Sequence, residues 1–501
     1  MLLPLMDKYG PTINWNLTGS LPSAMNFSRM GNATYVDENG YVTWAPANML
    51  PNGDFTGAVK PSRFPDGWVS AATQDGITVT VEDTGYEDGT PYVDIRYTGT
   101  AGNTSGSLHI FAADNSFPAS LGQSYTMSLH ARRVGGSLAG VASVNIASRE
   151  YANSTGLGAS FENTVLALTT TKTRFHRTYE CVEPTITQIR WGSRVVANLG
   201  ETIDVTIRYY QGMMERTSYN SPRPYIPTRG SAYYGPRFDH DLVTGRPIGL
   251  LYEPQRTNLI RNNTMVGGVA GTLGSGASYP TNWGGYTNTT AGMVRTLSYG
   301  TENGLSYIDQ RIYGTPSANY YQLFFETLTG IAGVQGNAFT ASSYMRLSGG
   351  STTNISHIKV GIQENNSSSS FLSSGTSGDL SLTSTFPTTP YAYARTLQSA
   401  STAYTRPFLQ LEWTAGVSID ITLRIYQPQF EKASTYSSDI PTTGTPATRA
   451  ADLLMLDIPD GISSLRYTFD DNSTQDVVVS PGSYTVPTNL NRPNIKRVVS
   501  V

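Results

Sequence analysis

The chain has 501 residues, of which 38% are hydrophobic and only 14% charged, with a formal net charge of −3. This length predicts two to four domains, and the absence of any long lysine or arginine run argues against nucleic acid as a partner. The one cysteine, Cys181, excludes an intrachain disulfide framework and a cysteine-based zinc site. No stretch has the apolar length of a membrane helix, so we expect no membrane insertion.

Residues 1–47 form an N-terminal arm whose first thirty residues show no periodicity. The start lacks the positive region of a signal peptide, so we expect assembly in the cytoplasm of the producing cell. Exposed apolar termini reduce solubility, so we expect the arm to dock on another protein. The apolar docking residues are Leu2, Leu3, Leu5 and Met6. Further along, residues 35–42 predict a hairpin around Asn39-Gly40.

Most of the remaining chain is an internal duplication. Residues 203–211 read IDVTIRYYQ and residues 419–427 read IDITLRIYQ, at an offset of 420 − 204 = 216. Residues 125–136 return as 339–350 at an offset of 214, and Tyr92 returns as Tyr307 at 215. A near-constant offset indicates two copies of one domain. We place module 1 at residues 48–221 and module 2 at residues 258–447.

The repeated line alternates with a period of two. Ile203, Val205 and Ile207 alternate with polar residues, and Ile419, Ile421 and Leu423 do the same in the second copy. This pattern predicts half-buried antiparallel strands, and helical periodicity is nearly absent. We therefore predict an all-β chain with two tandem duplicated β-sandwich domains of jelly-roll type.

Three features lie outside this common pattern. Residues 222–257 predict a connector hairpin with a turn near Thr244-Gly245, and residues 448–501 predict a small C-terminal β domain. The serine-rich residues 365–378 predict an expanded tip loop in module 2. Four charged residues of the connector are expected to hold it to a module through surface ion pairs of about 0–1 kcal/mol each. They are Arg237, Asp239, Glu253 and Arg256.

Several short segments resemble bacteriophage tail and virion-surface proteins. The motifs that carry this resemblance are FSR at 27–29 with ATYVD at 33–37, DLVTG at 241–245, EPQRTNL at 253–259, IPTTGTPATRAAD at 440–452 and GSYTVPT at 482–488. A second similarity lies in residues 48–55 with Trp68, which resemble the first strand of jelly-roll carbohydrate-binding modules. The matching residues 258–263 keep the paired asparagines only.

The resemblance implies a structural virion protein, expected in a tail fibre, spike or receptor-binding assembly that adheres to host surface glycans. Two alternatives stay open: a head fibre or capsid decoration protein, and a polysaccharide-degrading tailspike. The implied partners are other virion proteins, reached through the N-terminal arm, further copies of the chain, with a homotrimer favoured, and host polysaccharide. The implied location is the virion surface.

Sugars stack on exposed aromatic rings, and five tyrosines of module 2 have no aromatic counterpart in module 1. These candidate ligand residues are Tyr313, Tyr320, Tyr321, Tyr391 and Tyr393. The tryptophans are assigned to packing, with Trp68 matched to Trp283 and Trp191 matched to Trp413. As implied by related jelly rolls, a structural Ca²⁺ is conceivable at Asp54 and Asp204, and no other cofactor is expected.

Catalytic motifs are missing from the sequence. There is no Gly-x-Ser-x-Gly elbow, no phosphate-binding loop and no His-Glu-x-x-His motif, and the five histidines are scattered. Asp470 and Asp471 lie in a predicted turn, where such residues satisfy backbone donors. We therefore expect a protein without enzymatic activity.

Overall fold

The computed structural model describes residues 12–72, 74–103, 108–112, 117–153, 155–158, 162–217 and 219–501. Every regular element in these residues is a β-strand. None of them belongs to a helix long and apolar enough to cross a membrane. The chain divides into two compact units, one of residues Trp44–Gly235 and one that joins the residues before Trp44 to Pro236–Val501. The virion-anchoring candidates Leu2, Leu3, Leu5 and Met6 lie outside the described residues.

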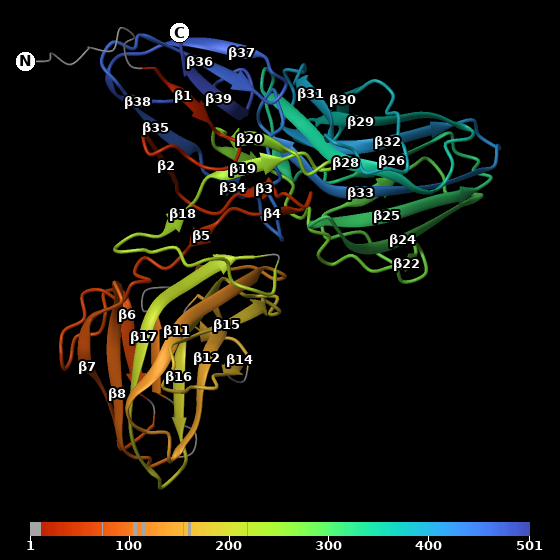
Figure 1. The fold of residues 1–501 in the computed structure, drawn as a ribbon. Coiled ribbons are helices and arrows are strands. Elements are labelled where there is room, and N and C mark those ends of the chain that lie inside the picture. The colour runs from red at the N-terminus through yellow and green to blue at the C-terminus, as the bar shows by residue number, and fades with distance from the viewer. Residues whose placement is uncertain are drawn as a thin grey trace, which may run out of the picture. The chain divides into compact units, whose positions relative to one another are not determined.

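The unit Trp44–Gly235 contains module 1, a sandwich of two antiparallel sheets (Figure 1). The first sheet has the order β15 (Thr173–Glu180), β11 (Ser124–Ser137), β17 (Thr202–Arg216), β8 (Thr90–Thr100), β7 (Ile77–Glu87). The second has the order β13 (Thr155–Gly156), β12 (Val141–Ala152), β16 (Gln188–Ala197), β9 (Leu108–Ala112), β6 (Trp68–Ala72), with β10 (Phe117–Pro118) on β16 and β14 (Glu162–Val165) on β12. A short pair, β5 (Ala47–Asn48) and β18 (Tyr233–Tyr234), joins the two ends of the unit.

Module 2 has the same strand order. Its first sheet runs β22 (Gly271–Thr272), β24 (Met293–Glu302), β25 (Leu305–Gly314), β33 (Ile419–Glu431), β28 (Ala338–Gly350), β31 (Tyr391–Thr396). Its second runs β23 (Gly284–Tyr286), β26 (Tyr320–Phe324), β32 (Tyr404–Trp413), β29 (Ile355–Asn365), β30 (Phe371–Thr376), with β27 (Ile331–Ala332) on β32. The prediction of two tandem duplicated β-sandwiches is confirmed.

The repeated sequence line forms the central strands β17 and β33. Ile203, Val205 and Ile207 face a core built from both sheets of module 1, and Ile421 and Leu423 do the same in module 2. The Gly-Gly pair that recurs in both copies marks a bulge in β11 and in β28. Gly136 and Gly350 adopt φ of 63° and 67°, and a Cβ there would strike the backbone of the neighbouring strand.

The arm, the connector and the C-terminal segment form one composite domain, although the sequence treats them as separate pieces. One sheet has the order β19 (Arg237–His240), β20 (Pro247–Leu251), β39 (Asn494–Ser500), β36 (Ser464–Phe469), β37 (Thr474–Val478), with β1 (Asn14–Asn16) also on β39. Smaller groups are β2 (Met25–Arg29) with β35 (Asp452–Ile458) and β38 (Gly482–Thr485), β21 (Arg256–Asn258) with β34 (Ala447–Arg449), and the hairpin β3 (Thr34–Val36) with β4 (Val42–Trp44). Ile13, Leu17 and Phe27 of the arm belong to its core.

A buried ion cluster, here called the arginine hub, holds this composite domain together. Arg237 is 0% exposed and its guanidinium lies 2.8 Å from Glu253 and 2.5 Å from Asp452. Arg29 of the arm pairs with the same Asp452 at 3.0 Å, and Arg449 pairs with Glu253 at 3.0 Å. The hub therefore links arm, connector and C-terminal segment.

The predicted connector ion pairs are revised by this arrangement. Arg237 and Glu253 do pair, but inside the domain and not on its surface. Asp239 accepts hydrogen bonds from Val36 N and Asn494 Nδ2, and Arg256 lies 4.0 Å from Glu431. Burial increases the loss of folding stability when one partner of an ion pair is removed, because the other partner remains as an uncompensated charge away from water.

The predicted hairpins are confirmed at residues 35–42 and at Thr244-Gly245, and β36 with β37 forms another in the C-terminal segment. The serine-rich stretch differs from the prediction of a tip loop. Its residues Phe371–Thr376 form β30, which pairs with β29, so only the residues between these strands form a turn. The serines suit the composition of a loop, but residues 371–376 extend the sheet as its edge strand.

Candidate functional site

The outward face of the first sheet carries the same six-residue cluster in both modules, here called the twin ion network. In module 1 it consists of Glu87, Tyr92, Asp94, Arg132, Arg208 and Tyr210. In module 2 it consists of Glu302, Tyr307, Asp309, Arg346, Arg424 and Tyr426. The sequence offsets are 214 to 216, the offsets of the duplication itself.

The geometry of the network is nearly identical in the two copies. Arg208 binds Asp94 through two hydrogen bonds of 2.6 and 2.7 Å, and its guanidinium lies 3.4 Å from the ring centroid of Tyr92. Arg424 binds Asp309 at 2.8 and 2.7 Å and lies 3.7 Å from the centroid of Tyr307. Bidentate pairs stacked on a ring fix the side chains rigidly.

Hydrogen-bond donors hold the two glutamates of the network in the charged form, whereas burial raises the pKa of Asp94 above its usual value. Burial works against the charge of Glu302, but hydrogen bonds from Tyr426, Arg424 and Arg346 outweigh it and lower its pKa to about 2. A hydrogen bond from Tyr210 is the largest cause that lowers the pKa of Glu87 in module 1. The two glutamates are therefore ionised near neutral pH and have no proton to donate there.

The pKa of Glu302 gives a testable pH dependence. A depressed pKa contributes stability above the ordinary value of 4.5, and this is lost as the pH falls from 4.5 through about 2. We expect Glu302→Gln to lower the free energy of unfolding by about 1.5–3 kcal/mol at pH 7, the usual loss of hydrogen bonds to a charged group. Chemical denaturation at pH 7 and at pH 2.5 measures the difference, which should shrink at the lower pH. A constant difference would contradict this prediction.

The five predicted tyrosines do not form one site. Tyr321 is fully buried, and its hydroxyl is hydrogen-bonded with Tyr279 and Gln310. Tyr313 lies on β25 against Arg311, and Tyr391 and Tyr393 lie on the edge strand β31 of the same sheet. Two strands, β33 and β28, separate β25 from β31. Tyr320 lies on the other sheet.

Tyr320 does belong to a set of outward side chains on the second sheet of module 2, here called the tyrosine face. Backbone pairing places Tyr286, Gln322, Gln410 and Lys359 on one rung across four strands. The next outward rung carries Tyr320, Glu412 and His357. The rings of Tyr286 and Tyr320 lie 6.2 Å apart, and Tyr286 is 54% exposed.

The polar half of the tyrosine face is a hydrogen-bonded row. Gln322 Nε2 donates to Gln410 Oε1 at 2.7 Å, and Gln410 Nε2 donates to Glu412 Oε1 at 2.6 Å. Lys359 lies 3.8 Å from Glu412. Ala71 occupies the rung of module 1 that corresponds to Tyr286, so the aromatic pair is particular to module 2.

Sequence reasoning missed both surfaces for identifiable reasons. Arg208 and Arg424 stand in the repeated line itself. A residue that recurs in both copies is explained by the shared fold, so neither arginine was a candidate site residue. Alternation along each strand could have shown that these arginines face outward. The tyrosine face depends on which strands pair, and Tyr286 and Tyr320 are 34 residues apart in the chain.

The two calcium candidates are not brought together. Asp54 accepts hydrogen bonds of 2.6 Å from Tyr225 and from Arg229, and Asp204 pairs with Arg96 at 2.9 Å. The loop of Asp54 lies at Gly212, eight residues along β17 from Asp204. Because a strand rises about 3.3 Å per residue, eight residues put the two acids roughly 26 Å apart. This distance is too long for both acids to bind one ion. In the described part of the chain, no group of three or more His, Cys, Asp and Glu is arranged to hold a metal.

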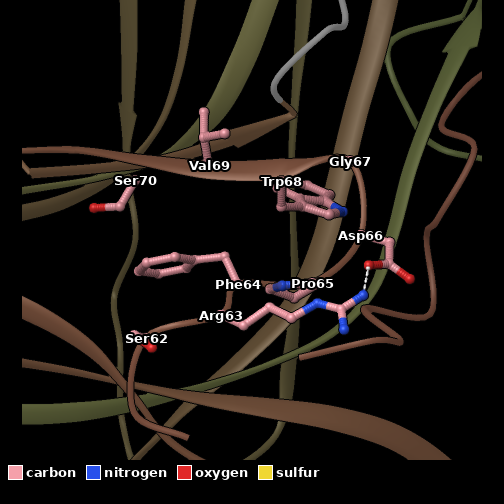
Figure 2. Close-up of a pocket in the computed structure, with 9 residues that line it drawn as sticks. All are labelled: Ser62, Arg63, Phe64, Pro65, Asp66, Gly67, Trp68, Val69 and Ser70. Atoms are coloured by element: carbon pink, nitrogen blue, oxygen red, sulfur yellow. Dashed lines mark hydrogen bonds and ion pairs between the residues drawn. The ribbon is translucent and has the colours of Figure 1, made fainter. Parts of the chain in front are cut away.

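Module 1 has an open hollow at residues 62–70 (Figure 2). Trp68 lines it, but its Nε1 donates to Asn52 O at 2.9 Å and its ring packs 4.6 Å from that of Phe55 in the core. Arg63 and Asp66 pair with each other at 2.7 Å, as the dashed line shows. The other aromatic ring of the hollow, Phe64, is partly buried against the core, so we do not assign the hollow a ligand.

The tryptophans are core residues, although one predicted correspondence is revised. Ser193 and Leu409 share an equivalent rung (409 − 193 = 216), so Trp191 corresponds to Pro407 and not to Trp413. Both tryptophans are nevertheless buried, at 1% and 3% exposure. Trp68 and Trp283 are equivalent, and each donates from Nε1 to the backbone of an asparagine.

Comparison with known proteins finds likeness in fold only. No family model matches the chain, and no curated protein matches it. Among solved structures, the N-terminal CBM22-1–CBM22-2 tandem domain from Paenibacillus barcinonensis Xyn10C is similar at 10% identity over 78% of this chain and 98% of its own, with a TM-score of 0.27. A structure titled "CBM4 structure and function" matches at 16% identity over 36% of this chain and 99% of its own, with a TM-score of 0.20. Infectious bursal disease virus, Gt strain, matches at 12% identity over 88% and 82%, with a TM-score of 0.17.

Proposed function

We propose that this chain is a non-enzymatic adhesion protein of a bacteriophage virion, whose module 2 binds host surface glycan on the tyrosine face. The virion assignment is supported by the sequence motifs at residues 27–37, 241–259 and 440–488. The glycan assignment is carried by one observation, the pair of exposed Tyr286 and half-buried Tyr320 beside a row of amide and charged side chains.

The chemistry of the face suits a neutral sugar chain. The C–H face of a pyranose packs on a flat ring, which the half-exposed pair of tyrosines offers. Amide groups both donate and accept hydrogen bonds, so Gln322 and Gln410 can meet ring hydroxyls without a charge requirement. Three inter-strand spacings of about 4.8 Å separate Tyr286 from Lys359, a span of roughly 14 Å that is long enough for more than one sugar unit.

Weak binding sites of this kind hold a particle on a cell only when several of them bind at the same time. One aromatic stack contributes only about 0.5–1.5 kcal/mol beyond its buried area. Several chains on one particle convert later binding events into intramolecular ones, which raises avidity without new contacts. The proposed homotrimer serves this purpose, and light scattering on the purified protein measures it.

The tyrosine face is tested by removing its rings. We expect Tyr286→Ala or Tyr320→Ala to weaken binding to host polysaccharide about tenfold, the effect of ~1.4 kcal/mol. Phenylalanine at either position should preserve most of the affinity because stacking needs the ring and not the hydroxyl. The matched control is Tyr86→Ala, which removes a tyrosine of module 1 that is 68% exposed. Equal loss from all three alanine variants would reject the tyrosine face as the site.

Two further measurements test the rest of the proposal. Incubation of the protein with host capsular or O-antigen polysaccharide should leave the length of the polysaccharide unchanged. A shorter polysaccharide would establish that the protein is a tailspike enzyme. Electron microscopy of virions with a label on the C-terminus should place the label on the tail. A label on the capsid would favour a head fibre or decoration protein.

A further inference from the structure

One corner of the first sheet of module 1, here called the basic corner, brings together three basic side chains. His130 of β11 pairs across the sheet with Arg174 of β15 on one side and with Tyr210 of β17 on the other. Lys172, just before β15, places its Nζ 4.3 Å from the ring centroid of Tyr210. Lys172 and Arg174 therefore both lie near His130 on the outward face of this sheet.

The basic corner has donors that no carboxylate uses. Arg174 donates to Ser128 Oγ at 3.0 Å and to Met213 Sδ at 3.8 Å, and among the described residues it forms no ion pair. His130 Nδ1 and Arg174 Nε are buried, with no hydrogen-bond partner in the described part of the chain. Buried polar atoms are rarely left unsatisfied in folded proteins. Arg174 Nε is a donor without an acceptor, and His130 Nδ1 becomes one when it carries a proton.

The acids on neighbouring strands already have partners. Glu87 accepts from Arg132 and Tyr210, and Glu215 accepts from Arg223 at 2.9 and 3.3 Å. Among the described residues of module 1, Lys172 forms no ion pair, and Arg174 has only the coulombic attraction of Glu215, which is itself bonded to Arg223. An oxyanion from outside would supply both the negative charge and the acceptor atoms.

Module 2 shows that the fold does not require this corner. Tyr344 replaces His130 (344 − 130 = 214). Tyr391 pairs with Ser343 where Phe175 pairs with Leu129 (391 − 175 = 216), so Thr388 and Pro390 stand at the positions of Lys172 and Arg174. The Phe386 ring packs 4.8 Å from Tyr426 and 5.6 Å from Tyr344, in an apolar cluster that includes Val42 and Leu242. Basic residues at this place are thus a property of module 1 alone.

We propose that the basic corner binds an oxyanion of a saccharide, either the carboxylate of an acidic sugar or the phosphate of a phosphorylated one. Lys172 and Arg174 supply the charge, and His130 supplies a further hydrogen bond. This site is separate from the tyrosine face and binds a different ligand class, so either can fail without the other.

The titration of His130 gives a direct readout. Burial, with Arg174 and Lys172 nearby, lowers the pKa of His130 to about 4. The imidazole is therefore neutral at pH 7. A bound anion offsets the two cations and favours the protonated ring, so it must raise this pKa.

The experiment is a titration of the full chain with oligogalacturonate, glucose 6-phosphate and neutral maltotriose, followed by calorimetry and by the NMR signals of His130. We expect one anionic probe or both to bind and to raise the pKa of His130, and maltotriose to leave it unchanged. Oligogalacturonate alone would identify a carboxylate ligand, and glucose 6-phosphate alone a phosphate ligand. The proposal is overturned if neither anion binds, or if the pKa does not move on binding.

Variants separate this site from general charge attraction. The double variant Lys172→Gln, Arg174→Gln should weaken anion binding at least about tenfold, because two charge-assisted contacts are lost. Arg63→Gln removes an exposed arginine elsewhere in module 1 and should leave the affinity unchanged. Thermal melting establishes that each variant is folded. Equal affinity in the double variant and the parent chain would reject the basic corner.

Discussion

Replacing Arg237 by alanine is expected to destabilise the unit that contains the composite domain by about 3–5 kcal/mol. The change leaves Glu253 and Asp452 without their shared cation in a site closed to water. Other cations remain, since Arg449 still pairs with Glu253 and Arg29 with Asp452, but each acid loses one of its two arginines. Hydrogen exchange followed by mass spectrometry measures the effect segment by segment.

The pattern of exchange matters as much as its size. Peptides of β19, β20 and β35 should lose protection, whereas peptides of residues 44–235 should keep theirs. The matched control is Arg466→Ala, because Arg466 and Asp476 form an ion pair exposed to solvent. It should leave protection unchanged, since exposed pairs contribute little. Similar effects from both variants would show that the burial of the hub has no energetic consequence.

Deletion of residues 1–30 is expected to unfold the composite domain. The deletion removes β1 and β2, which pair with β39 and β35, together with four buried side chains. These are Ile13, Leu17, Met25 and Phe27. Each such burial is worth about 1.5–3 kcal/mol, and the sum approaches the whole stability of a typical domain, about 5–15 kcal/mol.

Deletion of residues 1–11 is the matched control for this truncation. It leaves every pairing of the described residues in place, so peptides of residues 452–500 should stay protected. The same deletion removes the proposed anchor, so we expect the shortened chain to fold but to be missing from assembled virions. Incorporation at the level of the full chain would reject residues 1–11 as the anchor, and loss of protection would show that they stabilise the domain.

The sandwich modules could be predicted because their information is local and repeated. Ile203, Val205 and Ile207 alternate with polar residues, and the second copy repeats the alternation at the same spacing. The alternation of apolar and polar residues determines which side chains of a strand enter the core. Its recurrence in a second copy shows that the alternation is not due to chance. The bulges at Gly136 and Gly350 follow from the same comparison, since paired glycines recur at one offset.

The composite domain could not be predicted in this way. Asn14 pairs with Val499, and Phe27 pairs with Leu454. No sequence pattern in these segments indicates which distant segment each will pair with. Short strands show too few residues for periodicity, so the arm reads as irregular. The energetic role of Arg237 was likewise hidden, because burial is a property of the assembled domain.

The sequence by itself determined an all-β chain with two copies of one sandwich, because hydrophobic periodicity and duplication are written along the chain. Only the tertiary structure decided which outward residues meet. Strand pairing brings Tyr286 beside Tyr320, separates Tyr313 from Tyr391, and places Arg174 and Tyr210 on either side of His130. Ligand sites on a sheet are assembled across strands, at right angles to the direction in which a sequence is read.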